Sequence, residues 1–223
     1  MIQFDSNLLQ PIIYLAALLY GGKAFFNKKS PLYFKLFLFG VGCFFLEALY
    51  YTVDFLCNGA WSWDFNFACF GAGGCFAFMC SANYGLFDGI VDDGSKSALK
   101  ARQIGIIAPV TLAVILLLGI LGYINNSGSV LTIVIVLVSK IFAFPAAYFH
   151  LKHLVLKDDL NFMVSALRPF NASALAVILL DFVSTICYGL LWRPGIIVTA
   201  WALPVALLVM MITAEKGCKK WTI

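Results

Sequence analysis

The amino-acid sequence predicts an all-α integral membrane protein, a bundle of seven transmembrane helices in one domain over residues 1–223. The composition is 62% apolar and only 12% charged, with a mean hydropathy of +0.95, whereas a soluble domain is about half apolar and about a quarter charged. Apolar runs of roughly 20 residues, each long enough to cross a hydrocarbon core of about 30 Å, recur along the chain. The predicted spans are residues 8–26, 34–56, 66–88, 104–124, 129–151, 170–191 and 195–214.

The first span is predicted to be an anchor and not a cleavable signal peptide. Asp5 is the one charge before it, so the basic leader of a signal peptide is missing, and no small-residue cleavage site ends a short apolar core. The third span carries small residues at every fourth position, which stack on one helix face and allow another helix to approach closely. These residues are Gly73, Ala77, Ser81, Gly85 and Gly89.

Turn-forming and helix-breaking residues mark the later elements. The run 125–129, Asn-Asn-Ser-Gly-Ser, separates the fourth and fifth spans, and Arg193-Pro194-Gly195 separates the sixth and seventh. Pro145 lies five residues after Lys140 in the fifth span. Because proline cannot donate a backbone hydrogen bond, it predicts a kink beside this lysine. Pro204 predicts a similar irregularity in the seventh span.

The basic residues predict the orientation of the bundle. Thirteen of the 15 Lys and Arg residues fall in or beside the loops after spans 1, 3 and 5 and in the C-terminal tail. Since basic loops stay in the cytoplasm, the N-terminus is predicted outside and the C-terminus inside, most simply in a plasma (inner) membrane. The net charge of +4 reflects this bias and does not predict nucleic-acid binding.

A faint internal repeat connects the second and sixth spans. Residues 47–54 read Glu-Ala-Leu-Tyr-Tyr-Thr-Val-Asp, and residues 181–188 read Asp-Phe-Val-Ser-Thr-Ile-Cys-Tyr. Each segment lies in the middle helix of a three-span block, and both helices run from inside to outside. The pattern fits a 3+1+3 parallel repeat, with the fourth span connecting the two blocks.

The candidate site comes from ionisable residues at the middle of apolar spans, where a charge is costly and usually marks a site in the bundle interior. Lys140 and Asp181 are both predicted near the midplane on consecutive antiparallel helices, so a pair of Lys140 with Asp181 or Glu47 is expected. Helical spacing places further polar side chains beside them. The complete candidate set for solute binding is Glu47, Tyr51, Asp54, Asn83, Lys140, Asp181, Ser184 and Tyr188.

One midplane lysine faces at least two midplane carboxyl groups. The carboxyl group left without a cation would hold a proton, a cation or an amine, since burial disfavours an unpaired charge. A purely structural ion pair is the competing interpretation, and catalysis is a third. His150 and His153 are expected at the cytoplasmic edge in contact with solvent, so they do not predict a metal site.

Several chemistries find no support in the sequence. The last span has no lysine for a retinal Schiff base until Lys216 at its end, and no histidine lies at depth for an intramembrane Ser or Cys hydrolase. The seven Cys match no metal or redox spacing. No catalytic residue, metal or cofactor is predicted, and whether the protein is an enzyme is left open, with the balance of the sequence against it.

The leading functional prediction is a small multi-pass transporter or carrier that binds a small polar or cationic solute at a midplane polar site. Its predicted partners are the lipid bilayer and a small solute or proton, with a protein partner or a second copy left open. The first alternative is a membrane sensor or accessory subunit that acts through a partner protein. The second is an intramembrane enzyme that acts on a lipid.

Overall fold

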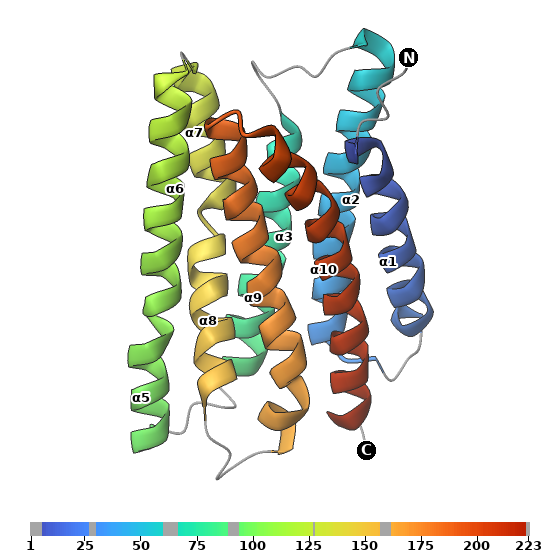
Figure 1. The fold of residues 1–223 in the computed structure, drawn as a ribbon. Helices are drawn as coiled ribbons and strands as arrows, with labels where there is room; N and C mark the ends of the chain where they lie inside the picture. Colours follow the sequence, from blue (N-terminus) through green and yellow to red (C-terminus); the bar gives the residue numbers. More distant parts are fainter. Residues whose placement is uncertain are drawn as a thin grey trace.

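The computed structural model describes residues 6–26, 30–59, 67–88, 94–126, 128–156 and 162–221. Within these ranges the chain is helical and contains no strand. Seven helical rods run up and down the bundle, and the first and last helices leave the chain ends at opposite ends of it (Figure 1). Apart from short turns of 3₁₀-helix at Ser6–Leu9 and Phe67–Cys69, the helices are α1 (Gln10–Phe25), α2 (Leu32–Asn58), α3 (Phe70–Ala82), α5 (Lys96–Gly105), α6 (Ile107–Asn125), α7 (Val130–Lys140), α8 (Ala143–Val155), α9 (Phe162–Gly189) and α10 (Arg193–Trp221), together with the π-helix η3 (Asn83–Asp88).

Five of the rods are long and apolar enough to cross a membrane. They comprise Leu32–Asn58, Lys96–Asn125, Val130–Val155, Ala166–Gly189 and Arg193–Lys220. The prediction of an α-helical membrane protein is therefore confirmed. The count of seven spans is not, because α1 has 16 residues and α3 has 13.

Local sequence explains where the helices start and stop. Pro31 precedes α2, and Gly59 ends it with φ +67° while its N–H bonds the carbonyl of Phe55 at 2.8 Å. Only glycine adopts this left-handed conformation at low cost. Ser95 begins α5 by accepting a hydrogen bond from the backbone N–H of Ala98 at 3.1 Å, which satisfies one of the free donors of a helix N-terminus.

The predicted kink in the fifth span lies at a two-residue turn. The helix α7 ends at Lys140, a turn follows at Ile141 and Phe142, and α8 begins at Ala143. Pro145 lies in the first turn of α8, where the missing N–H costs least. The turn therefore places a buried lysine at the carbonyl end of a helix, where the helix dipole favours a cation.

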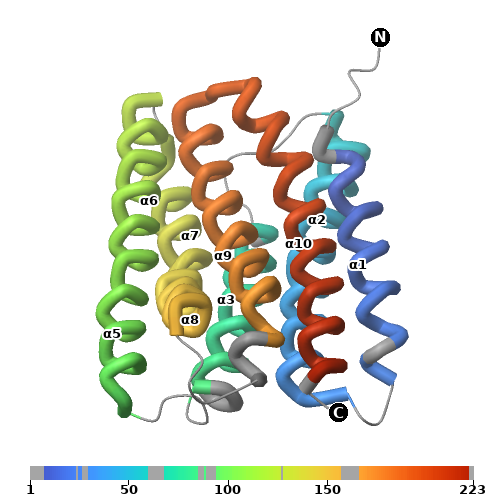
Figure 2. Tube along the Cα trace, turned by 60° about the horizontal axis from the view of Figure 1, so that its bottom comes forward, coloured from blue at the N-terminus to red at the C-terminus, as the bar shows by residue number. Residues whose placement is uncertain are grey.

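The helices α3 and α9 each pack against several other helices of the bundle. The helix α3 packs against α2 on one side and against α7 and α8 on the other, whereas α9 packs against α6, α8 and α10. Figures 1 and 2 show α1 and the α5–α6 rod on opposite flanks of the molecule. The outer face of α6 exposes a stripe of aliphatic side chains that suits contact with lipid: Val110, Val114, Leu117, Leu118 and Leu121.

The close approach of α3 to its neighbours is confirmed at one of the predicted small residues and contradicted at another. A Cβ atom on Gly73 would lie 2.9 Å from the carbonyl oxygen of Ser139, so α7 packs directly against this backbone. Ser81, two turns further along, is exposed. The stripe of small residues therefore does not form one continuous contact, and Gly89 lies outside the described residues.

Candidate functional site

A cavity of about 220 Å³ lies in the half of the bundle where α1 begins. Its walls come from α1, α2, α6, α7, α9 and α10, and they reach Gln10 in the first turn of α1 and Thr132 in the first turn of α7. Six of the eight predicted site residues line it, namely Glu47, Tyr51, Lys140, Asp181, Ser184 and Tyr188. The sequence reasoning therefore brought together side chains that the fold also gathers around one cavity.

Lys140 and Asp181 form a buried ion pair in the cavity wall, as predicted. The two residues are 6% and 7% exposed. The ammonium nitrogen of Lys140 also lies 5.8 Å from the ring centre of Phe76 and 5.7 Å from that of Phe182, distances at which an aromatic ring attracts a cation. This lysine is therefore neutralised by the protein itself.

Glu47 lies in the same wall without an equivalent partner. Its Oε2 atom is buried and has no hydrogen-bond partner among the residues that the structure describes. Gly71 of α3 makes room for the side chain, because a Cβ atom there would lie 2.5 Å from Cβ of Glu47 and 3.0 Å from Oε2. An unsatisfied buried oxygen is costly and rare in native proteins, so Oε2 of Glu47 is an unusual atom that lies between α2 and α3 beside the cavity.

The remaining cavity walls combine aromatic rings with hydroxyl groups. Tyr14, Phe44, Tyr51 and Tyr188 supply the rings. Ser184, Thr185, Thr132 and Thr199 supply the hydroxyl groups. A convergence of apolar rings with a few polar atoms is typical of small-molecule sites.

A second irregular helix borders the cavity. Pro204 lies inside α10 and cannot donate to the carbonyl of Ala200, a residue of the cavity wall. Together with the end of α7 at Lys140, this places two interrupted backbones at one cavity. Interrupted helices are how many transporters present backbone groups to a solute or ion.

Two of the predicted site residues lie elsewhere. Asp54 lies three residues beyond Tyr51 on α2, less than one turn past the cavity wall, where its Oδ1 accepts a hydrogen bond from Asn58 at 2.7 Å near the exposed end of the helix. Asn83 lies in the opposite half of the bundle, at the start of η3. Helical spacing placed both side chains on plausible faces, but it could not determine how far along the bundle the cavity extends.

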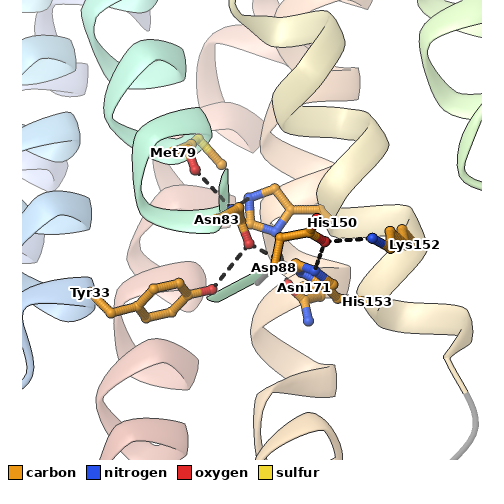
Figure 3. Close-up of polar contacts among 8 residues, drawn as sticks. All are labelled: Tyr33, Met79, Asn83, Asp88, His150, Lys152, His153 and Asn171. Atoms are coloured by element: carbon orange, nitrogen blue, oxygen red, sulfur yellow. Dashed lines mark hydrogen bonds and ion pairs between the residues drawn. The ribbon is translucent and has the colours of Figure 1, made fainter. Parts of the chain in front are cut away.

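Asn83 is the centre of a second polar cluster, which lies where α8 ends (Figure 3). The prediction that His150 and His153 are solvated at the membrane edge is wrong, because both are 0% exposed. The ring of His150 lies 3.2 Å from Asn83 through Nε2 and 2.9 Å from Oδ1 of Asn171 through Nδ1.

The charged members of the cluster meet at Asp88. Its Oδ1 atom lies 3.0 Å from Nε2 of His153 and 2.6 Å from the ammonium nitrogen of Lys152. The Nδ1 atom of His153 lies 3.2 Å from Oδ1 of Asn83, and the hydroxyl group of Tyr33 donates to the same oxygen at 3.4 Å. Residues from α2, η3, α8 and α9 are thereby joined in one network.

Sequence reasoning missed this cluster for an identifiable reason. The two histidines are three residues apart and so share one face of α8, but their partner Asp88 is 65 positions away from His153. No local spacing reveals such a contact. The available signal was that Asp88 and the two histidines were predicted at the same end of the third and fifth spans.

Comparison of the chain with protein-family models, with curated proteins and with solved structures found no match.

Proposed function

We propose that the protein is a small multi-pass transporter that binds a small cationic solute in the cavity, with Glu47 as the solute's counter-charge. The observation that carries the proposal is that Glu47 lines the cavity with a carboxyl group whose Oε2 atom has no partner among the described residues. Lys140 is already paired with Asp181. A cation or an amine would satisfy the remaining carboxyl group and restore charge balance in the cavity.

The aromatic lining supports a cation over a neutral solute. Tyr14, Phe44, Tyr51 and Tyr188 line the cavity together with Glu47. Aromatic faces attract ammonium groups by about 0.5–2 kcal/mol, depending on desolvation. A carboxylate surrounded by such rings is suited to a compact organic cation or a protonated amine.

The packing of the rods supports the 3+1+3 repeat as part of the proposal. In the first block α1 packs against α2, and α2 packs against α3; in the second, α8 packs against α9, and α9 packs against α10. A two-fold axis that exchanges the blocks would exchange the contact of α1 with α10 for the contact of α3 with α7 and α8. Both contacts are present. A pseudo-two-fold arrangement would relate Glu47 of α2 to Asp181 of α9.

Seven spans and an N-terminus-outside orientation complete the proposed architecture. The 3₁₀ turn before α1 extends that rod to residues 6–25, and η3 extends the third rod to residues 70–88. At 1.5 Å per residue both rods approach the thickness of a bilayer core. The basic end of the bundle would face the cytoplasm, and the cavity would then extend toward the outside.

Ligand-induced stabilisation of the purified protein tests the proposal. Ammonium, methylammonium, choline, a diamine, Na⁺ and K⁺ are screened for a rise in the unfolding temperature, because a ligand that binds the native state stabilises it. We expect an organic cation to stabilise the wild type and Glu47→Gln to abolish this effect while the protein stays folded. Asp181→Asn should weaken it by releasing Lys140 into the cavity.

Asp54→Asn is the matched control, since it neutralises a carboxyl group on the same helix outside the cavity. It should retain the full stabilisation. A Glu47→Gln protein that is stabilised by the same cation as the wild type would refute the proposed site. Binding that requires Glu47 without uptake into proteoliposomes would instead favour a sensor or accessory subunit.

A further inference from the structure

The contacts of Asn83 with Met79 and His150 favour one arrangement of hydrogen atoms on His150. The side-chain nitrogen of Asn83 lies 2.8 Å from the carbonyl oxygen of Met79, which can only accept, so this atom is Nδ2 and it donates. The same Nδ2 atom lies 3.2 Å from Nε2 of His150. Nε2 must therefore accept, and the single proton of His150 is on Nδ1, where it is donated to Oδ1 of Asn171 at 2.9 Å. His150 is neutral in this arrangement.

The same reasoning gives His153 the opposite charge state. Oδ1 of Asn83 can only accept, so Nδ1 of His153 donates to it across 3.2 Å. Nε2 of His153 faces Oδ1 of Asp88, an atom that also accepts from the ammonium group of Lys152. A carboxylate oxygen shared in this way is ionised, so Nε2 also donates. His153 therefore carries both protons and a positive charge.

The network holds the second half of an interrupted rod. The turn at Ile141 and Phe142 interrupts the fifth rod between α7 and α8, and both residues are exposed. His150 and His153 fasten α8, the part beyond this turn, to η3 and α9 (Figure 3). A π-helical segment such as η3 is often found at functional positions.

We propose that His150 is a proton-binding site at the inner end of the bundle, and that proton uptake there releases α8 from η3. A proton on Nε2 of His150 would point at the N–H of Asn83, which cannot turn away without losing Met79. The proton can bind only when the Asn83–His150 contact is broken. Acid therefore favours the released state, since a ligand shifts an equilibrium toward the state that binds it better.

The surroundings of His150 contain few other charges. The titratable and charged groups within the network are Tyr33 of α2, Asp88 of η3, and Lys152 and His153 of α8, and Arg168 lies three residues before Asn171 on α9. The rings of Phe170 and Phe37 lie 5.4 Å and 6.1 Å from that of His150. On α5, the basic residues Lys96, Lys100 and Arg102 are exposed.

Below, the closed state is the one in which α8 is bound to η3. The two histidines make the population of this state depend on pH in opposite directions, with an acid limb from His150 and an alkaline limb from His153. A histidine released into water binds its second proton near pH 6.5. The closed state needs a neutral His150, so closure is lost as the pH falls below that value. It also needs a charged His153, so closure is lost as the pH rises above it. The ratio of closed to released protein should therefore be greatest near pH 6.5 and fall on either side, approaching tenfold per pH unit away from the maximum.

The distance between the inner ends of α2 and α8 tests the proposal directly. Spin labels are placed at Leu32→Cys and Val155→Cys in a protein whose exposed thiol is removed by Cys57→Ser. Pulsed electron paramagnetic resonance then measures the label distance from pH 5 to pH 9. We expect a short distance near pH 6.5 and a longer one whose share grows in acid and in alkali. The measurement requires no solute, so it is independent of the function proposed for the cavity.

His150→Gln is the decisive variant, because glutamine can accept from Asn83 and donate to Asn171 but does not titrate. It should lose the acid limb alone, and His153→Gln should lose the alkaline limb alone. Tyr148→Phe, on α8 outside the cluster, should behave as the wild type. Asn83→Leu should show the longer distance at every pH. An acid limb that persists in His150→Gln, a wild-type distance that does not change with pH, or a closed Asn83→Leu protein would each overturn the proposal.

Discussion

At the scale of single residues, Lys140 is constrained from three directions. It ends α7, it is paired with Asp181, and it lies between the rings of Phe76 and Phe182. Removing one member of a buried pair leaves the other charge without compensation, at a typical cost of about 3–5 kcal/mol. We therefore expect Lys140→Met to lower the thermal unfolding temperature strongly.

The double variant Lys140→Met/Asp181→Asn provides the control, since it removes both charges. It should recover part of the lost stability, as measured by the heat-induced reaction of buried thiols such as Cys75 with a fluorescent dye. Equal destabilisation of the single and double variants would show that packing by the lysine side chain, and not its charge, holds α7 and α9 together.

The site residues were predictable where local spacing sufficed. Glu47 and Tyr51 share one face of α2, and Asp181, Ser184 and Tyr188 share one face of α9. Both faces line the cavity. Partners such as Gly71 against Glu47 could not be predicted, because they depend on the packing register of two helices. The same holds for Asp88 and His153, which are distant in sequence.

At the scale of elements, α3 shows how small residues determine helix packing. A Cβ atom at Gly73 would meet the backbone of Ser139, which cannot move aside as a side chain can. We expect Gly73→Leu to destabilise the bundle by about 1–3 kcal/mol or more through overpacking. Ser81→Leu lies on an exposed surface of the same helix and should change the unfolding temperature little.

The sequence predicted the rods well and their internal breaks only in part. Pro145 correctly indicated an irregular backbone beside Lys140. It did not determine that a two-residue turn at Ile141 and Phe142 separates α7 from α8, because proline is compatible with a kink as well as with a new first turn. The π-helix of residues 83–88 had no local signal, since its widened turn is stabilised by contacts of Asn83 and Asp88 with α8.

At the scale of the whole molecule, charge and cavity are segregated along the bundle axis. The described basic residues other than Lys140 and Arg193 belong to those ends of α1, α2, α5, α8, α9 and α10 that meet at one end of the bundle (Figure 1). The cavity begins at the opposite end, and buried rings such as Phe37 and Phe170, 4.5 Å apart, fill the half between it and the basic end. The carrier proposed above would need such an asymmetry.

The final prediction concerns the orientation of this asymmetric bundle in the membrane. Because basic segments are retained in the cytoplasm, Cys57 at the far end of α2 should react from outside with a membrane-impermeant thiol reagent in intact cells. A cysteine introduced at the exposed residue Lys96 should react only after the cells are opened. The two positions lie at opposite ends of the bundle, so each is the control for the other. Reaction of Lys96→Cys but not of Cys57 in intact cells would invert the orientation, and the cavity would then face the cytoplasm.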